Sequence, residues 1–292
     1  MVTSPKAALG VWPAPPPKVL EWPVFRPVLL NLESMRILVT FAVEAEFAPW
    51  RALRSFRKIR INPKHWSGGV EVNEVQIGGC KLWVFLTGIG IKSFDFAVAS
   101  CLKAAGVDLV LSSGLAGSLK PQYGPEEIVV PRKVGTLRNA SGIALPQRLV
   151  SFAESNGAKV IETLLASDRI IETREEKCRL SNFAEAVDME SFHVAQAFTD
   201  EGVPVVIIRA ISDGSEEDLP VDFTKCLTPE GRVRPGTLLK ELFGRPARIP
   251  ELIRFGRQSR SAARKLSSFL DGFILALTAD VVDHEARQVA TR

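Results

Sequence analysis

The sequence predicts an α/β protein, with a single three-layer α/β/α domain around a mixed central sheet and a C-terminal helical extension. Strand-like runs alternate with stretches in which apolar residues recur every three to four positions, which is typical of a sheet covered by helices on both faces. Two glycines, Gly78 and Gly79, separate two such runs and indicate an antiparallel hairpin. At 292 residues, 46% of them hydrophobic, the chain is long enough for one large α/β domain or two small ones.

The strand-like runs are short and apolar, whereas the helical patterns are amphipathic. The expected strands are 36–42, 81–87, 108–112, 127–130, 159–164 and 203–211, and the hairpin is formed by 71–77 and 80–85. The expected helices are 46–56, 94–105, 146–155, 174–182 and 190–201. Because the hairpin is antiparallel and the alternating segments favour parallel strands, the sheet is expected to be mixed.

Residues 1–34 differ in character from the rest of the chain. They contain Trp12, Trp22 and a high density of prolines, which prevents a helix and favours an extended, irregular tail. A natural start at Met35 would explain the segment equally well, since the first strand begins immediately afterwards. The alternatives are a ligand for an aromatic-lined groove and an arm around a neighbouring subunit.

Composition excludes several classes of protein. The formal charge of +4 is small, and the basic residues are spread out until the C-terminal region, so nothing indicates binding to nucleic acid. The four cysteines and three histidines lie far apart, which argues against a zinc site, another metal centre or a disulfide framework. No window resembles a signal peptide or a membrane span. We therefore expect a cytoplasmic protein without a metal.

Three loops after predicted strands have the chemistry of a binding crevice, which forms at the C-terminal ends of strands in such sheets. Two of them, 87–90 and 113–118, are rich in glycine, which lets backbone amides approach a ligand, although tight turns are the simpler explanation. The third, Ser212-Asp213-Gly214, follows the most apolar strand. A partly buried carboxyl there tends to keep its proton to a higher pH and can donate it near neutral pH.

A second carboxylate, Glu190, lies about one helix length before the strand that ends near Asp213. Together two such groups can hold the hydroxyls of a sugar and protonate a leaving base. Either acid alone could also have a purely structural role. For Glu190, an acidic side chain at the start of a helix is favoured by the helix dipole, and Asp188 could be the N-cap of the same helix. The occurrence of both acids in this order favours function.

Five motifs in order carry a resemblance to a known family. They are Phe41-Ala42-Val43-Glu44-Ala45-Glu46, Thr87-Gly88-Ile89-Gly90, Ser113-Gly114-Leu115-Ala116-Gly117, Val187-Asp188-Met189-Glu190-Ser191 and Arg209-Ala210-Ile211-Ser212-Asp213. The sequence resembles the nucleoside phosphorylase and nucleosidase superfamily, particularly the methylthioadenosine/S-adenosylhomocysteine nucleosidases. The part from Leu238 onward is similar to the hopanoid-associated phosphorylase branch, thought to act on adenosylhopane. The resemblance implies a catalytic domain at 35–244, followed by a basic amphipathic helix and tail at 245–292.

The resemblance also implies a reaction, cleavage of the N-glycosidic bond of a purine nucleoside, with adenine as the expected base. Asp213 matches the acid that protonates N7 of the purine, and Glu190 matches the carboxylate that holds the ribose 2′- and 3′-hydroxyls. Glu46 matches the carboxylate that activates the attacking water. No cofactor is implied, because leaving-group protonation and electrostatics make the sugar cation.

Further site residues follow from the same motifs. Met189 would pack under the ribose, Arg209 and Ser212 match residues that orient the acid, and Ile171 matches a position that contacts the base. The remaining candidates for substrate binding are Ile170, Gly88, Gly90, Gly114, Leu115 and Ala116.

Two residues depart from the nucleosidase pattern. Leu115 replaces a serine, and Ile170 replaces an aromatic residue that stacks on the purine. These changes leave the purine and the 5′ group of the substrate open, and a larger, apolar 5′ group would suit them. Glu46 has its own alternative, because Glu44 is also suitable for its role and acids are common in the first turn of a helix.

The stretch after Ile249 is a basic amphipathic helix, in which apolar residues recur at helical spacing among arginines. Such a helix can lie on an anionic membrane surface, which would help an enzyme to reach a lipid nucleoside. The alternative is that the apolar face packs on the domain and the arginines face water.

The acceptor of the sugar is the remaining question. Glu46 would repel phosphate and favours water, so we expect a nucleosidase. Phosphorolysis, with phosphate as co-substrate, is the alternative, and its anion site would need Arg169, Arg132 or Lys92 to fold in. A nucleoside-binding sensor without catalysis is a third interpretation, against which both retained acids argue. Family members are commonly homo-oligomers, and we expect the same here.

Overall fold

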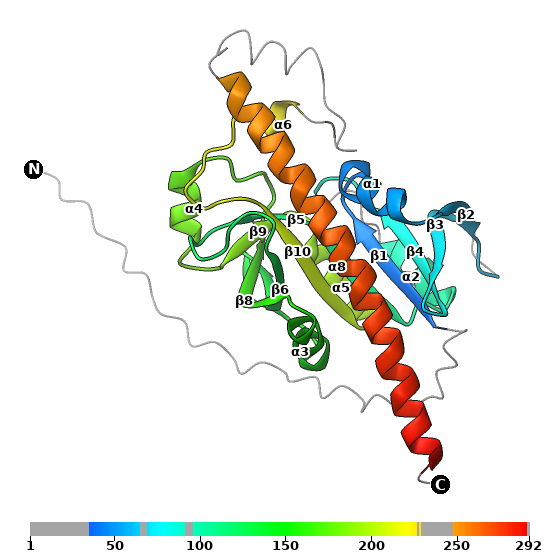
Figure 1. The fold of residues 1–292 in the computed structure, drawn as a ribbon. Helices are drawn as coiled ribbons and strands as arrows, with labels where there is room; N and C mark the ends of the chain where they lie inside the picture. The colour runs from blue at the N-terminus through cyan, green and yellow to red at the C-terminus, as the bar shows by residue number, and fades with distance from the viewer. Residues whose placement is uncertain (1–34, 65–68, 91–95, 227, 229–247, 291–292) are drawn as a thin grey trace, which may run out of the picture.

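The computed structural model of the protein describes residues 35–64, 69–90, 96–226, 228 and 248–290 (Figure 1). The expected tail at 1–34, Lys92, and the stretch from Leu238 to Arg245 lie outside the described residues. The α/β class, the mixed sheet and the C-terminal helix are confirmed.

The described residues form seventeen helices and strands. In chain order they are β1 (Arg36–Phe41), α1 (Glu44–Leu53), β2 (Arg57–Ile61), β3 (Val70–Ile77), β4 (Cys80–Leu86), α2 (Phe96–Ala104), β5 (Leu109–Ser118), β6 (Ile128–Thr136), β7 (Asn139–Ala144), α3 (Gln147–Ser155), β8 (Lys159–Ala166), α4 (Arg174–Leu180), β9 (Ala186–Asp188), α5 (Ser191–Asp200), β10 (Val205–Asp213), α6 (Phe223–Cys226) and α8 (Ile249–Ala290). All expected strands and helices are present, whereas β2, β7 and β9 were not predicted.

The sheet has an open part and a closed part. β1 pairs in parallel with β4 and β5, and β4, β3 and β2 continue the sheet as antiparallel neighbours. On the other side, β5, β10, β6, β8 and β9 each pair with two neighbours in turn and form a closed ring. The ring brings the ends of β5, β9 and β10 together, because Gly117 lies opposite both Val187 and Asp213.

The two-glycine turn closes the hairpin of β3 and β4 as expected. Gly78 has φ +57° and Gly79 has φ +88°, a left-handed conformation that suits glycine and matches the twist of paired strands. A side chain at Gly78 would also meet Thr278 of α8, because an added Cβ would lie 2.3 Å from the Thr278 hydroxyl oxygen. The turn therefore closes the hairpin, and the absence of a side chain at Gly78 leaves room for α8 to pack against it.

The helices cover both faces of the sheet. In Figure 1, α8 crosses in front of β10 and β5 and runs beside α1, whereas α2 and α5 lie behind. Trp50 of α1 packs edge-on against Phe41 and Phe56, so an aromatic cluster anchors α1 on the sheet. The alternating pattern of the sequence thus produced the expected layers.

Helix α8 packs along the domain for much of its length. Its buried residues include Leu266, Leu270, Phe273 and Ile274, all less than 2% exposed. Asp271 accepts hydrogen bonds from the guanidinium of Arg54, the residue just after α1, and from the indole of Trp50 in α1. These hydrogen bonds hold the pKa of Asp271 below its usual value. The packing interpretation of this helix is therefore correct for its middle part. Within the described residues, no helix is long and apolar enough to cross a membrane.

Candidate active site

A large cavity lies where β5, β9 and β10 end, between the sheet, α1 and α8. Its volume is about 1070 Å³, and apolar side chains dominate its lining. The predicted site residues that line it are Glu46, Leu115, Ala116, Ile170, Ile171, Met189, Glu190, Ser212 and Asp213. The carboxylates of three separate segments therefore open into one cavity, as the sequence motifs predicted.

Asp213 ends β10 and is 5% exposed. Ser212 donates a 2.6 Å hydrogen bond from its hydroxyl to Oδ1 of Asp213, which fits the orienting role expected of Ser212. Oδ2 accepts a 2.5 Å hydrogen bond from Nζ of Lys177 in α4. Lys177 therefore places its ammonium group directly against the predicted acid, a contact that the sequence did not indicate.

Glu190 stands at the N-cap position of α5, although its side chain does not cap the helix. Its Oε1 instead accepts a 2.6 Å hydrogen bond from the amide of Gly90. Burial and the nearby charge of Asp188 raise the pKa of Glu190 to about 8. The carboxyl is thus held toward the cavity, and its raised pKa means that it keeps its proton to a higher pH than an ordinary glutamic acid.

Glu46 lies in the first turn of α1 and is buried, whereas Glu44 is about half exposed and pairs with Arg51. Oε2 of Glu46 accepts from the amide of Ala42 at 2.9 Å, and Oε1 accepts from the amide of Leu115 at 2.9 Å. Burial raises the pKa of Glu46, and these backbone hydrogen bonds oppose the rise. Of the two candidates, Glu46 is the one that faces the site.

Gly114 allows the close approach of Glu46 to the loop after β5. Its φ is +150°, and an added Cβ would lie 3.2 Å from Oε1 of Glu46. The glycine-rich motif therefore makes room for a carboxylate here. Gly88 does not line the large cavity. Its amide instead donates a 2.9 Å hydrogen bond to the carbonyl of Ala42.

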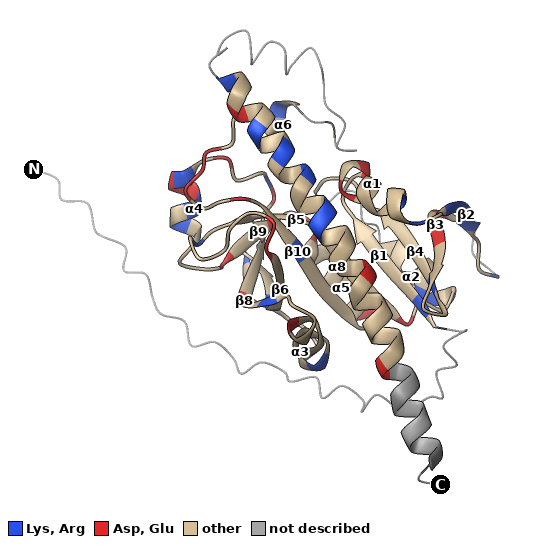
Figure 2. Cartoon of the chain, viewed as in Figure 1, with Lys and Arg blue, Asp and Glu red and all other residues tan. Residues whose placement is uncertain are grey.

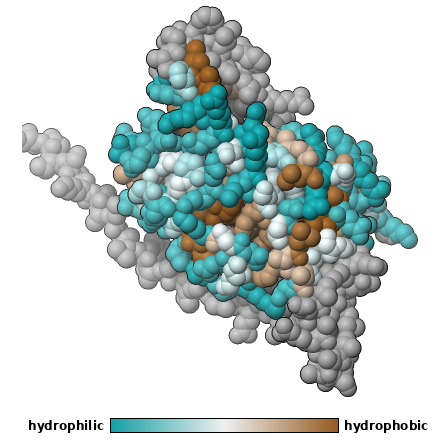
Figure 3. Space-filling view, in the orientation of Figure 1, coloured by the Kyte–Doolittle hydropathy of each residue, from teal (hydrophilic) through white to brown (hydrophobic). Residues whose placement is uncertain are grey.

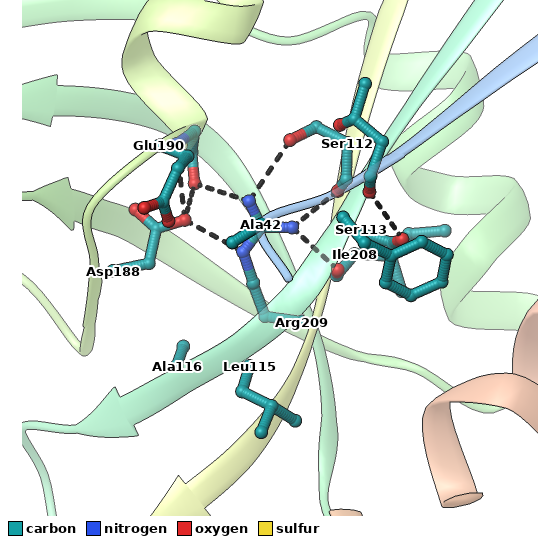
Figure 4. A network of polar contacts seen from close by, with 12 residues as sticks. Ala42, Ser112, Ser113, Leu115, Ala116, Asp188, Glu190, Ile208 and Arg209 are labelled. Carbon is teal, nitrogen blue, oxygen red and sulfur yellow. Dashed lines mark hydrogen bonds and ion pairs between the residues drawn. The ribbon is translucent and has the colours of Figure 1, made fainter. Parts of the chain in front are cut away.

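A buried network of polar contacts lies under the carboxylates (Figure 4). Nε of Arg209 donates to Oδ2 of Asp188 at 2.8 Å, and its other nitrogens donate to Ser112, Ile208 and Ser191. Asp188 also accepts from the amide of Ser191 at 3.3 Å, at the start of α5. The expected acceptor for the helix start is thus Asp188, while Glu190 occupies the N-cap position.

The contacts change the interpretation of Arg209. It was expected to orient Asp213, but its hydrogen bonds run to Asp188 and the neighbouring strand, and Asp213 is not among its partners. With Arg209 2% exposed and all of its nitrogens engaged, the guanidinium braces the loop that carries Glu190.

A second, much smaller cavity lies between Glu46, Glu190 and Arg209. Its volume is about 10 Å³, which is near the space that one water molecule needs. Thr40, Ser112 and Gly114 also line it. Arg169 lines the large cavity and pairs with Glu176, while Arg132 pairs with Glu162 outside both cavities.

Helix α8 forms the far wall of the large cavity. The residues of α8 that line it are Leu252, Phe255, Gly256, Ser259, Arg260, Ala263, Arg264, Ser267 and Ser268. Opposite them, α1 contributes Ala45, Ala48, Pro49, Ala52 and Leu53. This wall was not anticipated, because an apolar helical face shows that a helix packs but not which ligand or element it faces.

Lys177 was also missed by the sequence interpretation. The only hint in the sequence is its spacing. Lys177 lies three residues before Leu180, so both residues lie on the buried face of α4. Gly117 was noted only as part of a motif, and an added Cβ there would lie 3.0 Å from Oδ2 of Asp213.

Comparison with known proteins gives the family. A sequence model described as the Phosphorylase superfamily matches residues 36–243. The chain belongs to the phosphorylase superfamily. This superfamily enzyme is 27% identical over 187 residues to the 5'-methylthioadenosine/S-adenosylhomocysteine nucleosidase of Shewanella halifaxensis, covering 56% of this chain and 81% of the relative.

Solved structures confirm the fold of the phosphorylase-superfamily domain. The native futalosine hydrolase of Helicobacter pylori aligns with a TM-score of 0.60 and 20% identity, over 82% of this chain and 97% of that one. The S. pneumoniae 5'-methylthioadenosine/S-adenosylhomocysteine nucleosidase, bound to a transition-state inhibitor, aligns with a TM-score of 0.61 and 16% identity, over 83% and 100%. In this superfamily enzyme, α8 begins after the end of the family match and still lines the cavity.

Proposed function

We propose that this enzyme cleaves the N-glycosidic bond of a purine nucleoside and releases the free base, with adenine as the expected base. The observation that carries the proposal is the convergence of Glu46, Glu190 and Asp213, from three of the five sequence motifs, on one cavity. A nucleosidase needs an acid for the base, a clamp for the sugar and a base for water. The three carboxylates supply these functions.

Each carboxylate has surroundings that suit its role. The proton of Asp213 passes to N7, so that the purine leaves as a neutral base rather than an anion. Glu190 accepts hydrogen bonds from the ribose hydroxyls, and these bonds strengthen as positive charge develops on the sugar. Met189 adjoins Glu190 in the cavity wall, which supports a packing role against the ribose. Ile170 and Ile171 offer apolar area to the base.

Water is favoured over phosphate as the acceptor. The cavity between Glu46 and Glu190 has room for about one water molecule, and two carboxylates in its wall would repel an anion. The cation that lines it, Arg209, already donates to Asp188, Ser112 and Ser191. Phosphorolysis therefore remains the second candidate, and phosphate would be a co-substrate only in that case. Hydrolysis by this route needs no cofactor.

The large cavity favours a nucleoside with a bulky apolar group at the 5′ position. Its volume of about 1070 Å³ reaches the upper end of the range for ligand pockets, and its far part is lined by α1 and α8. Ala48, Ala52, Phe255 and Ala263 offer an apolar surface there. The similarity to the hopanoid-associated branch makes adenosylhopane the specific candidate.

Helix α8 also supports the proposed contact with a membrane surface. Figure 2 shows the basic residues gathered along the half of α8 near Ile249, and Figure 3 shows hydrophobic surface on the same face of the molecule. Ile249 and Ile253 are 42% and 49% exposed among these arginines. Sedimentation with vesicles containing anionic lipid tests this contact, and equal sedimentation with neutral vesicles would argue against it. Sedimentation equilibrium tests the expected homo-oligomer.

Release of adenine tests the proposed reaction. Adenosine, methylthioadenosine and a 5′-alkyl adenosine are each incubated with the enzyme, with and without phosphate. We expect release without phosphate, fastest for the alkyl compound, and none from Asp213→Asn. If no substrate releases base, the reaction is wrong. If release of the base requires phosphate, then phosphate and not water is the acceptor of the sugar, and Glu46 does not activate water.

A further inference from the structure

Lys177 is a fully buried charge that the proposed reaction does not yet use. Its exposed fraction is 0%, and its ammonium nitrogen donates to three oxygens. These are Oδ2 of Asp213 at 2.5 Å, the carbonyl of Gly214 at 2.8 Å and the carbonyl of Glu217 at 2.9 Å. An ammonium has three N–H donors, and a neutral amine has only two. The three acceptors match the three N–H donors of an ammonium group.

The two oxygens of Asp213 have different partners. Oδ1 accepts from the Ser212 hydroxyl, which also lies 3.2 Å from the carbonyl of Ala116. The Ser212 hydroxyl can therefore donate a hydrogen bond to a charged Asp213, or accept one from a neutral Asp213 while it donates to the carbonyl of Ala116. Oδ2 is bound to Lys177 in either state. The site thus tolerates both protonation states without moving the carboxyl group.

Charges behind Asp213 define its electrostatic surroundings. A polar cavity of about 390 Å³ borders Asp213, and its charged lining consists of Glu216, Glu217, Asp218, Arg248, Glu251 and Arg254. Glu217 pairs with Arg254 at 3.5 Å and accepts from the amide of Gly214 at 3.3 Å. Among the described residues, Lys177 is the cation that contacts Asp213 directly. It therefore exerts the strongest attraction on that carboxylate.

The geometry points to Lys177 as a positioning residue that makes Asp213 a stronger acid in the glycosidic cleavage. This inference rests on the proposed function. As the C1′–N9 bond breaks, its electron pair goes to the base and the Asp213 proton binds N7. The carboxylate left behind is stabilised by Lys177, which keeps its own three protons throughout. The water that attacks the sugar loses a proton to Glu46. Glu46 then releases this proton to solvent, and Asp213 takes one proton from solvent through the polar cavity, so the cycle consumes one water molecule and returns both acids to their starting states.

We expect this arrangement to narrow the pH range over which Asp213 can act as an acid. Because a neighbouring cation favours the carboxylate, the pH above which kcat falls is lowered by Lys177. Removal of the charge should therefore move that high-pH limit upward while the maximal rate falls, since the weaker acid transfers its proton less readily. A residue that only braced the fold would not shift the limit in this way.

Two substitutions separate charge from packing. Lys177→Met keeps the length of the side chain without its charge, and Lys177→Arg keeps the charge. For adenine release, we expect Lys177→Met to raise the high-pH limit of kcat by about one pH unit or more and to lower maximal kcat at least about tenfold, with KM little changed. Lys177→Arg should restore the wild-type limit.

An N7-methylated purine nucleoside provides the internal control, because its base already carries the positive charge that protonation would supply. A folded Lys177→Met enzyme should cleave it as fast as the wild type does. If Lys177→Met keeps the wild-type limit and rate while Asp213→Asn is inactive, the role of Lys177 is wrong and the proposed function stands. If Asp213→Asn is fully active, the assignment of Asp213 itself fails.

A spectroscopic measurement tests the inference independently of the catalytic rate. In infrared difference spectra against the matching Asp213→Asn protein, the carboxyl band of Asp213 should disappear at a lower pH in the wild type and in Lys177→Arg than in Lys177→Met. Disappearance of the band at the same pH in all three proteins would overturn the inference.

Discussion

The amide of Gly90 donates a 2.6 Å hydrogen bond to Oε1 of Glu190, which joins two segments that are 100 residues apart in the sequence. The contact fixes the carboxyl group and occupies one of its acceptor positions, leaving the others for the substrate. Because Glu190 is buried near Asp188, its pKa is raised to about 8. The charge state of Glu190 therefore changes within the range in which enzymes are commonly assayed.

This pKa predicts the pH dependence of the sugar clamp. Glu190 must be charged to accept hydrogen bonds from both ribose hydroxyls, so kcat/KM should rise about tenfold per pH unit below about pH 8 in the free enzyme. Above that pH the contribution of Glu190 becomes constant. Initial rates at low substrate concentration check the slope. Glu190→Gln should abolish this ascending limb, and an unchanged limb in that variant would assign it to another group.

The same carboxyl predicts a gain in stability on substitution. Its pKa is raised from the ordinary value of a glutamic acid to about 8, so the folded state binds the proton more tightly and the free energy of unfolding falls as pH rises through this range. Glu190→Gln should not show this fall. The difference between variant and wild type should grow by up to about 1.4 kcal/mol per pH unit between pH 5 and 8. Urea unfolding at several pH values measures it, and parallel curves would contradict the assignment.

Glu46 and Glu44 form a matched pair for testing the activation of water. Glu46→Gln keeps the shape of a side chain buried against Leu115, and should lower kcat about 100-fold or more because the amide cannot accept the proton. Glu44 is exposed and pairs with Arg51, so Glu44→Gln should leave kcat within about twofold. The rate of base release distinguishes them, and equal losses would show that Glu46 has no special role.

Arg209 predicts a large effect on stability. Arg209→Met would leave the buried carboxylate of Asp188 without its cation, which should lower the free energy of unfolding by about 3–5 kcal/mol. The double variant Asp188→Asn/Arg209→Met should recover part of this loss, because no charge is then buried alone. Chemical denaturation measures both variants. A loss below about 1 kcal/mol for Arg209→Met would show that the ion pair does not hold the loop.

The wall formed by α8 predicts a change in specificity. Ser268 is exposed and lines the cavity, so Ser268→Phe should narrow it without disturbing the buried core. We expect kcat/KM for a 5′-alkyl adenosine to fall at least about tenfold relative to that for adenosine. Lys265→Phe adds the same ring at an exposed position outside the lining and serves as the control. An equal fall for both substrates would place the 5′ group elsewhere.

Most of the strands, and the acid at the end of β10, could be predicted from the sequence because their signals are local. Gly78 and Gly79 determine a turn by themselves, and Asp213 ends a mostly apolar strand whose nine residues are all buried. β9 was missed because three residues, Ala186–Asp188, are too few for periodicity to show. β7, at Asn139–Ala144, contains a glycine and polar residues that resemble a loop.

The rest of the site depends on contacts between distant segments. The proximity of Lys177 to Asp213 follows from how α4 packs against the end of β10, and no pattern near either residue indicates it. The family resemblance implied that Arg209 orients Asp213, whereas the closed ring of strands brings Asp188 to Arg209 instead. The apolar face of α8 was recognised, but its position beside α1 is a property of the tertiary fold.

The closed ring and α8 divide the molecule into two parts that can change independently. Glu190 and Asp213 lie at or just beyond strand ends that backbone pairing holds in place, so their positions depend on the sheet as a whole. The opposite wall is one face of a single helix, and an exchange of its small residues alters only the space offered to a substrate. Relatives with different substrates could therefore arise by substitutions on α8 alone, while the reaction is retained.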